Sequence, residues 1–187
     1  MRALVCASVA AVVACGRSDS DATRTEDTSP PAAAEPATHR PEELVTAATD
    51  LVGFLRGQVP FSRLRLADTV TLRLGIEEGG TMRRVPRERL REPSAWSVTS
   101  LNGGFTYQFA PHPSLTSVET RVGRHVRCMD HDLTATDAEL GALPHVGVVL
   151  SPPDFSSCLQ TWNLTIVFDA ELKPPTVVAA IYDQFEW

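Results

Sequence analysis

Apolar and polar side chains alternate over several short stretches of the chain, and this two-residue period predicts β-strands with one buried face. The clearest stretches are residues 160–169, which place Trp162 and Phe168 on one face, and residues 177–186. An Asn-Gly-Gly sequence at residues 102–104 separates two other stretches and is typical of a tight hairpin turn. Further strands are expected at residues 68–74, 96–101, 105–109, 118–128 and 145–150.

Before these strands, residues 41–57 carry apolar side chains at the three- and four-residue spacing of an amphipathic helix. Pro41 suits the first helical position, because its missing N–H has no helical partner there, and Gly57 is suited to end the helix. Shorter helical segments are expected at residues 60–66 and 85–92. This order predicts an α+β domain, in which an N-terminal helix precedes a mostly antiparallel, curved sheet of about five to six strands.

The first residues follow another pattern, because residues 3–14 form an almost continuous apolar run. The run is too short to span a bilayer, which takes ~20 helical residues, but it has the length of a secretory signal core. It ends in the sequence Val-Val-Ala-Cys at residues 12–15, which resembles the lipobox of bacterial lipoproteins. The resemblance implies that residues 1–14 are a signal peptide. It also implies that the sulfur of Cys15 carries a diacylglycerol thioether, with palmitate-type acylation of the new amino terminus.

The lipobox implies a location in the bacterial cell envelope, with the lipid bilayer as a partner through the acyl anchor on Cys15. Two or three acyl chains hold a protein firmly at a membrane, whereas one chain holds it only marginally. Gly16 follows the cysteine where an aspartate often marks retention in the inner membrane, so the outer membrane is favoured if the cell is Gram-negative. The alternative is an ordinary secretory peptide in which the cysteine has this position by chance.

Residues 15–40 connect this leader to the rest of the chain and consist mainly of Ser, Thr, Asp, Ala and Pro. They contain almost no large apolar side chain, so burial cannot offset the entropy lost on ordering them. We therefore expect a flexible tether with a typical reach of ~28 Å. Residues 41–187 are expected to form a single domain, since no second linker and no repeat interrupts them.

The chain of 187 residues has a formal charge of −6, which argues against general nucleic-acid binding because such binding requires clustered cations. Its hydrophobic fraction of 43% is enough for one globular core. Residues 82–91 run against the acidic balance, because five of them are arginines. This basic stretch either contacts anionic lipid headgroups or forms a solvated helix face.

Four cysteines are present, and two of them belong to the leader and its lipidated end. The remaining two, Cys128 and Cys158, are expected to form a disulfide, because an exported domain folds in an oxidising compartment. The alternative is a metal site that uses Cys128 with His131, or His125, Asp130 and His131. The spacing of these residues matches no established metal motif, so the disulfide is the expectation.

Asp183 is the candidate for acid/base chemistry, because it falls within the apolar alternation of the last strand. If that alternation is unbroken, its carboxylate shares a face with Val177, Ala179 and Ile181. Asp68 opens the apolar face of an earlier strand and is a second candidate. An inward carboxylate on a concave sheet is one way to build a proton-transfer site. The alternatives are a register shift that leaves Asp183 in water and a structural pair with an arginine.

A helix followed by a strongly curved sheet that ends in a long hairpin resembles the NTF2-like, or SnoaL-like, cone fold. Domains of this fold include isomerases, dehydratases and plain ligand binders, so the resemblance does not select a function. The sequence contains no nucleophile motif, phosphate loop or dinucleotide fingerprint, and no cofactor is expected.

The hypothesis is therefore a membrane-anchored domain that binds a small ligand or an envelope protein without catalysis. The alternative is a cone-like hydrolase or isomerase that uses Asp183 and Asp68 as acid/base groups. A third possibility is a structural component of an envelope complex, which would show an exposed apolar patch.

Overall fold

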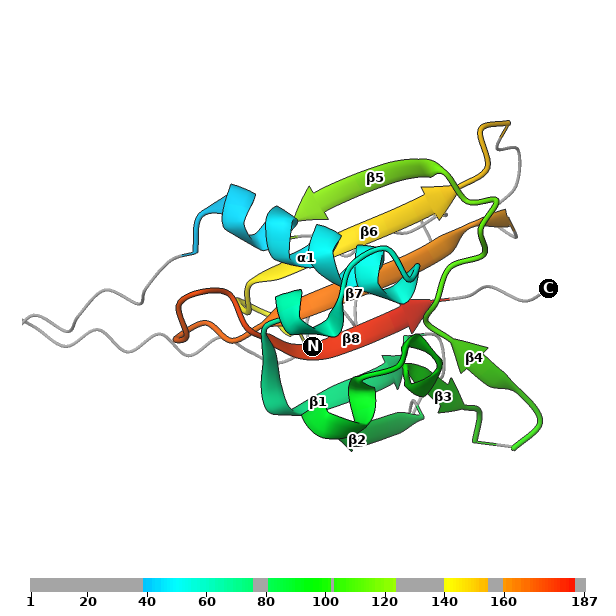
Figure 1. Cartoon of the computed structure of the whole chain (residues 1–187), viewed down its shortest axis with the longest axis horizontal. Coiled ribbons are helices and arrows are strands. Elements are labelled where there is room, and N and C mark those ends of the chain that lie inside the picture. Colours follow the sequence, from blue (N-terminus) through cyan, green and yellow to red (C-terminus); the bar gives the residue numbers. More distant parts are fainter. Residues whose placement is uncertain (1–38, 76–80, 102, 124–139, 155–159, 184–187) are drawn as a thin grey trace, which may run out of the picture. The chain divides into compact units, whose positions relative to one another are not determined.

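The computed structural model describes residues 39–75, 81–101, 103–123, 140–154 and 160–183 of the chain. All of them belong to the second of the two compact units into which the chain divides, residues 35–187. Across these ranges, one α-helix and a six-stranded sheet form an α+β fold (Figure 1). None of the helices described there is long and apolar enough to cross a membrane.

The described strands form one large sheet and one small hairpin. They are β1 (Leu66–Leu74), β2 (Met82–Pro86), β3 (Ser97–Thr99), β4 (Thr106–Gln108), β5 (Ser117–Val122), β6 (His145–Ser151), β7 (Trp162–Phe168) and β8 (Val177–Asp183). The large sheet has the order β2-β1-β8-β7-β6-β5, and only its pair β1–β8 is parallel. Strands β3 and β4 pair with each other across the expected turn. The α+β class and the mostly antiparallel sheet predicted from the sequence are therefore confirmed.

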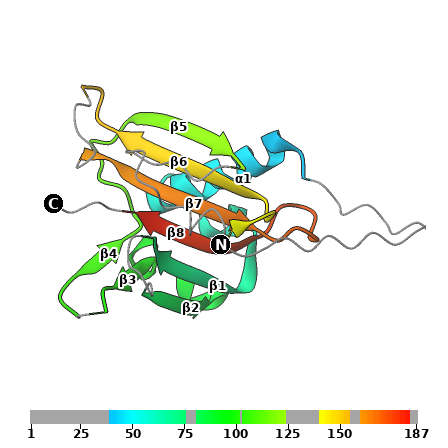
Figure 2. The ribbon, with the colours of Figure 1, turned by 180° about the vertical axis from the view of Figure 1, so that it is seen from behind.

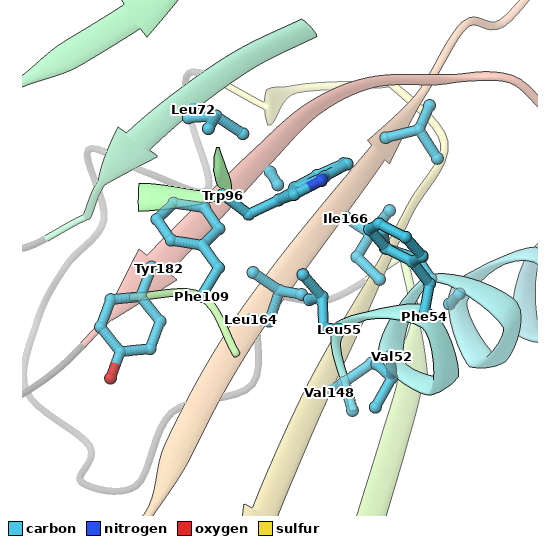
Figure 3. Packing of buried hydrophobic residues seen from close by; sticks show 14 of the residues in the cluster. Val52, Phe54, Leu55, Leu72, Trp96, Phe109, Val148, Leu164, Ile166 and Tyr182 are labelled. Carbon is cyan, nitrogen blue, oxygen red and sulfur yellow. The ribbon is translucent and has the colours of Figure 1, made fainter. Parts of the chain in front are cut away.

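Helix α1 (Pro41–Leu55) packs over β6 and its neighbours and closes the main core on one face of the sheet (Figures 1 and 3). The helix ends at Leu55, and Gly57 closes its last turn with a φ of +71°, which suits a residue without a side chain. The N–H of Gly57 donates to the carbonyl of Phe54 over 2.8 Å. Phe54 meets the fully buried ring of Trp96 edge-on, with 6.4 Å between ring centroids. The buried residues of the helix are Leu44, Ala48, Leu51, Val52, Phe54 and Leu55.

The segment after β1 differs from the sequence prediction. Residues 85–92 were expected to be helical, but β2 runs through Pro86 and a single 3-10 turn, η2 (Arg87–Leu90), follows it. Only Val85 of β2 is buried, so the strand carries no alternating pattern that would have identified it. The basic stretch is thus an edge strand and a turn rather than a solvated helix face. Two more 3-10 turns are η1 (Phe61–Arg63) and η3 (Pro93–Ala95).

The large sheet separates two apolar clusters. Successive side chains of a strand point to opposite faces, so Ala180 and Tyr182 of β8 belong to the main core beside α1. Ile181, between them, packs with Leu140 and Val167 in a second cluster. Figure 2 shows the domain from behind, with the face of the sheet that lies opposite α1, here called the back face, toward the viewer. Strand β8 is therefore enclosed on both sides.

A bulge in β8 interrupts the alternation that the sequence predicts for this strand. In the pairing of β8 with β7, Phe168 lies opposite Val177, whereas its neighbour Val167 lies opposite Ala179. Val178 therefore has no partner on β7 and is the extra residue of the bulge. The bulge turns Val177 into the main core. The prediction that Val177 shares a face with Ala179 and Ile181 was wrong, whereas the latter two do meet in the second cluster.

The described part of the chain begins at His39, whose buried side chain is held by the turn between β7 and β8. Its Nε2 lies 2.7 Å from the carbonyl oxygen of Asp169. A carbonyl oxygen can only accept, so Nε2 carries the proton in this bond. The contact attaches the segment that precedes α1 to the end of the sheet where β7 finishes and β8 begins.

Candidate functional site

A pocket of about 610 Å³ lies at the end of the sheet where β7 begins and β8 finishes. The hairpin β3–β4 and the segment that leads to β5 form its other walls. Its volume falls within the roughly 300–1,000 Å³ typical of small-molecule sites. We call it the aromatic pocket, and its lining includes Tyr107, Gln108, His112, Gln160, Trp162 and Tyr182.

Tyr182 is the centre of a group of rings in this pocket. Its ring stacks on Phe109 with 5.4 Å between centroids, and the two rings lie side by side in Figure 3. The centroids of Tyr107 and Trp162 are 6.3 Å and 6.5 Å from that of Tyr182. These separations are within the range of favourable aromatic pairs, so the rings hold one another in place.

A hydrogen bond fixes the indole of Trp162 as well. Its Nε1 donates to the carbonyl oxygen of Phe109 over 2.9 Å, which ties β7 to the end of the β3–β4 hairpin. Trp162 and Tyr182 are both almost fully buried, with exposed fractions of 2% and 6%, whereas Tyr107 is half-buried. The inner wall is therefore tightly packed, and the ring of Tyr107 is the more exposed aromatic surface of the two walls.

The outer wall of the aromatic pocket supplies polar groups. The N–H of Ser114 donates to Nδ1 of His112 over 3.3 Å, and the Ser114 hydroxyl lies 2.7 Å from the same nitrogen. Because Nδ1 accepts, the neutral imidazole carries its proton on Nε2 and can donate it to a ligand. The amides of Gln108 and Gln160 and the hydroxyl of Thr161 also line this wall. Among the described lining residues there is no Asp, Glu, Lys or Arg.

A second hollow, of about 550 Å³, lies at the end of the sheet where β8 begins. We call it the charged groove, because six ionisable side chains line it together with several neutral residues. One side of the groove is α1 and the other includes the turn before β8. The charged residues are Glu42, Glu43, Asp50, Arg63, Arg65 and Lys173.

Several charges in and beside the groove already pair with one another. Nη2 of Arg63 lies 3.3 Å from Oδ2 of Asp50. Arg40, just before the helix, donates two hydrogen bonds to Oε1 of Glu43. These bonds lower the pKa of the Glu43 carboxyl, since they favour its ionised form, and they raise the pKa of Arg40.

Asp183 lies at the end of β8 with an exposed fraction of only 1%. By alternation it points to the back face with Ile181, opposite to Tyr182 and the aromatic pocket. Its carboxylate occupies the space beside Gly75, where an added Cβ would lie 1.7 Å from Oδ1. The N–H of Gly75 donates to the carbonyl of Tyr182 over 2.9 Å, which holds the two backbones this close. Only a glycine at position 75 leaves room for the carboxylate.

Asn163 is the cross-strand neighbour of Asp183 on β7, and it too is 1% exposed. Neither atom of its side-chain amide has a hydrogen-bond partner within the described ranges. Asp183 and Asn163 therefore form a buried polar pair on the back face. Neither residue is among the described lining residues of the aromatic pocket or of the charged groove.

Asp68 does not join Asp183. Its side chain is 98% exposed and lies 3.7 Å from Nη2 of Arg87, so it does not point into the apolar face predicted for it. The pairing of β1 with β8 is irregular between Leu66 and Thr71, and Asp68 falls in this irregular part. Asp183 lies near the far end of β1, about 20 Å along the strand from Asp68. The proposed acid/base pair is not brought together.

Comparison of the chain with protein-family models, with curated proteins and with solved structures gave no match.

Several residues singled out from the sequence lie outside the described residues. They are the lipidation candidate Cys15, the disulfide candidates Cys128 and Cys158, and the alternative metal ligands His125, Asp130 and His131. Within the ranges that are described, no three His, Cys, Asp or Glu side chains gather as a metal site would require.

The sequence reasoning did not identify the residues of the aromatic pocket. Tyr107 was placed in a hairpin strand, and Trp162 and Tyr182 in core strands, but nothing indicated that they meet. The one available signal was the hairpin at residues 97–108, which carries an exposed Phe105 beside Tyr107. The exposure of Phe105 is visible only in the structure, and a single exposed aromatic residue would not by itself have indicated a pocket.

Proposed function

We propose that this chain is a lipid-anchored protein of the bacterial cell envelope whose folded domain binds a small uncharged ligand in the aromatic pocket. The observation that supports the ligand site is the combination of held aromatic rings with amide, hydroxyl and imidazole groups and no ionised side chain in the described lining. Such a lining fits a ligand with a flat apolar face and polar edges. A saccharide has both, because its C–H face can lie on Tyr107 while its hydroxyls reach Gln108, Gln160 and His112.

To test this, the neutral disaccharide di-N-acetylchitobiose is titrated into the full chain. Cys15 is replaced by serine so that the chain carries no lipid. Amide signals in ¹H–¹⁵N spectra report where the ligand binds. We expect shifts at Tyr107, Gln108 and Gln160 and none at Arg63 in the charged groove. A disaccharide of similar size with a ring carboxylate is the control and is expected to bind more weakly. Preference for the carboxylated sugar, or shifts confined to the charged groove, would contradict the proposal.

The envelope anchor is supported by the Val-Val-Ala-Cys sequence at residues 12–15 and by the polar composition of residues 16–40. In this proposal residues 1–14 are removed, Cys15 carries the acyl chains and residues 15–40 tether a domain that begins at residue 41. Cys15→Ser is expected to move the protein from the detergent phase to the aqueous phase after phase separation. A variant that stays in the detergent phase would show that the lipobox interpretation is wrong.

Two finer points complete the proposal. Cys128 and Cys158 form a disulfide, so the intact mass of the exported chain is lower than that of the reduced chain by two hydrogen atoms. Intact-mass measurement before and after reduction tests this.

The domain is also proposed to begin with its helix and to continue as a curved sheet.

A further inference from the structure

Strand β5 forms one edge of the large sheet, and all six of its residues are exposed. On the face toward α1, Val118 and Val122 are 59% and 37% exposed although both are apolar. An edge strand presents unpaired N–H and C=O groups and can pair with another strand. Among the described strands, none pairs with the outer side of β5, and the apolar face of this strand is incompletely covered.

The direction of the free peptide groups follows from the pairing with β6. Gly123 continues the register of β5 and lies opposite His145, to whose carbonyl its N–H donates over 2.7 Å. In an antiparallel pair, residues that bond directly to the partner strand alternate with residues that do not. Arg121 and Glu119 therefore direct their peptide groups toward β6. The peptide groups of Val118, Thr120 and Val122 point away from the sheet.

This edge is self-complementary. When two copies of β5 pair antiparallel around a two-fold axis at Thr120, each Thr120 bonds to Thr120 of the second copy. Val118 then lies opposite Val122 of the second copy, and Glu119 lies opposite Arg121 of the second copy. The charged residues occupy the positions without backbone bonds, where side chains of an antiparallel pair are closest. Moving the axis to residue 119 or 121 would set like charges against each other.

We propose that the β5 edge binds a second copy of this chain and so joins two sheets through a two-fold axis at Thr120. The inference is independent of the ligand proposed for the aromatic pocket. The pair formed by Glu119 and Arg121 within one copy shows that these side chains reach each other along the edge. In the proposed pairing, the same two charges and those of the second copy form a closed ring of four.

The opposite edge does not offer this pairing. Strand β2 carries Arg83 and Arg84 at its centre and ends in Pro86, which has no N–H. A two-fold axis at either arginine would set that arginine against itself. The charges along the two edges therefore favour self-pairing at β5 and not at β2. A substitution on β2 serves as the matched control.

The test measures the dimer dissociation constant by sedimentation velocity on the full chain with Cys15 replaced by serine. Glu119→Arg alone and Arg121→Glu alone each turn two favourable contacts into two repulsive ones. Each is expected to raise the dissociation constant at least about tenfold. Mixed together, the two variants form complementary pairs again, so a heterodimer close to the parent affinity is expected. Arg83→Glu on β2 is expected to leave the dissociation constant unchanged.

Thr120→Pro provides a second measurement, because it removes an outward N–H at the two-fold axis and no bond to β6. It is expected to abolish the dimer without lowering the melting temperature of the monomer by more than a few degrees. The proposal is overturned if the parent chain is monomeric at high concentration. It is equally overturned if charge reversal at residues 119 and 121 leaves the dimer intact, or if the mixture of the two variants does not associate.

Discussion

The two hollows of the domain have similar volumes, about 610 Å³ for the aromatic pocket and about 550 Å³ for the charged groove, but opposite chemistry. The charged groove has three acidic and three basic residues in its lining, and some of these charges already bind one another, as Arg63 and Asp50 do. The aromatic pocket offers ring faces and neutral polar groups that a ligand can use. The two hollows therefore differ in the chemistry that their linings leave available for a ligand, and not in the space that they offer.

The two hollows also differ in what supports them. The aromatic pocket is built on two strands that are packed on both faces and on a hairpin tied to them by Trp162. The charged groove lies beside the exposed side of α1, where the paired charges are open to solvent and are screened by salt. Substitutions in the aromatic pocket should therefore affect folding and binding, whereas those in the groove should have small effects.

The largest effect is expected from Tyr182→Ala, because this ring contacts Phe109, Tyr107 and Trp162. Removing a buried aromatic side chain leaves a cavity, so the free energy of unfolding should fall by ~3–5 kcal/mol. Urea denaturation followed by tryptophan fluorescence measures this loss. Tyr182→Phe keeps the ring and should cost no more than ~1.5 kcal/mol. Equal losses in both variants would show that ring packing does not support the pocket.

The next effect is expected from Gly75→Ala on the back face behind the aromatic pocket. The new methyl group would displace the carboxylate of Asp183, at a cost of ~1–3 kcal/mol in the free energy of unfolding. The double variant with Asp183→Ala removes the clash, so its loss should be smaller than the sum of the single losses by ~1 kcal/mol or more. Denaturant titration of all four proteins gives this difference. Additive losses would mean that the methyl group and the carboxylate do not meet.

A smaller effect is expected from Tyr107→Ala, which removes the half-buried ring that faces the ligand. Loss of the stacking between this ring and an apolar ligand face should raise the dissociation constant by up to about tenfold. The stability of the fold should change little, because the ring is only half-buried. Calorimetric titration with di-N-acetylchitobiose measures the dissociation constant. Arg63→Ala in the charged groove is the matched control and should leave it unchanged. If both variants bind alike, the ligand does not occupy the aromatic pocket.

The smallest effect is expected at Glu43 beside the charged groove. Arg40 lowers the pKa of this carboxyl in the folded protein, so the pair stabilises the fold above the ordinary pKa of a glutamate. This contribution is lost as the pH falls through the lowered pKa. Glu43→Gln lacks it, so the melting temperature of the variant should fall less in acid than that of the parent. Thermal melts across the acidic range test this, and parallel curves would contradict it.

The strands were predictable because apolar and polar residues alternate along them in the sequence, although β7 proved to be buried on both faces. Residues 160–169 and 177–186 contain β7 and β8, and Asp183 lies at the buried position that the alternation indicated. Prediction failed where the backbone departs from that period. The bulge at Val178 reversed the face of Val177, and the irregular pairing of β1 left Asp68 in solvent.

The aromatic pocket was not predictable for a different reason. Tyr107 and Tyr182 are far apart in the sequence and come from different sheets, so their contact depends on how the hairpin docks on the large sheet. No periodic pattern encodes that docking. The parallel pairing of β1 with β8 is similarly non-local, because it joins the first and the last of the described strands.

The bond between His39 and the carbonyl of Asp169 also sets the point at which a tethered domain would take up mechanical load. In the proposed envelope protein, a pull on the tether would reach the sheet at the end of β7, beside the start of β8, whereas the aromatic pocket lies at the finish of this seven-residue strand, about 20 Å away. His39 is thus attached at one end of the sheet, and the aromatic pocket lies at the other. If the proposed tether holds the domain at His39, a ligand would enter the pocket at the end away from the attachment.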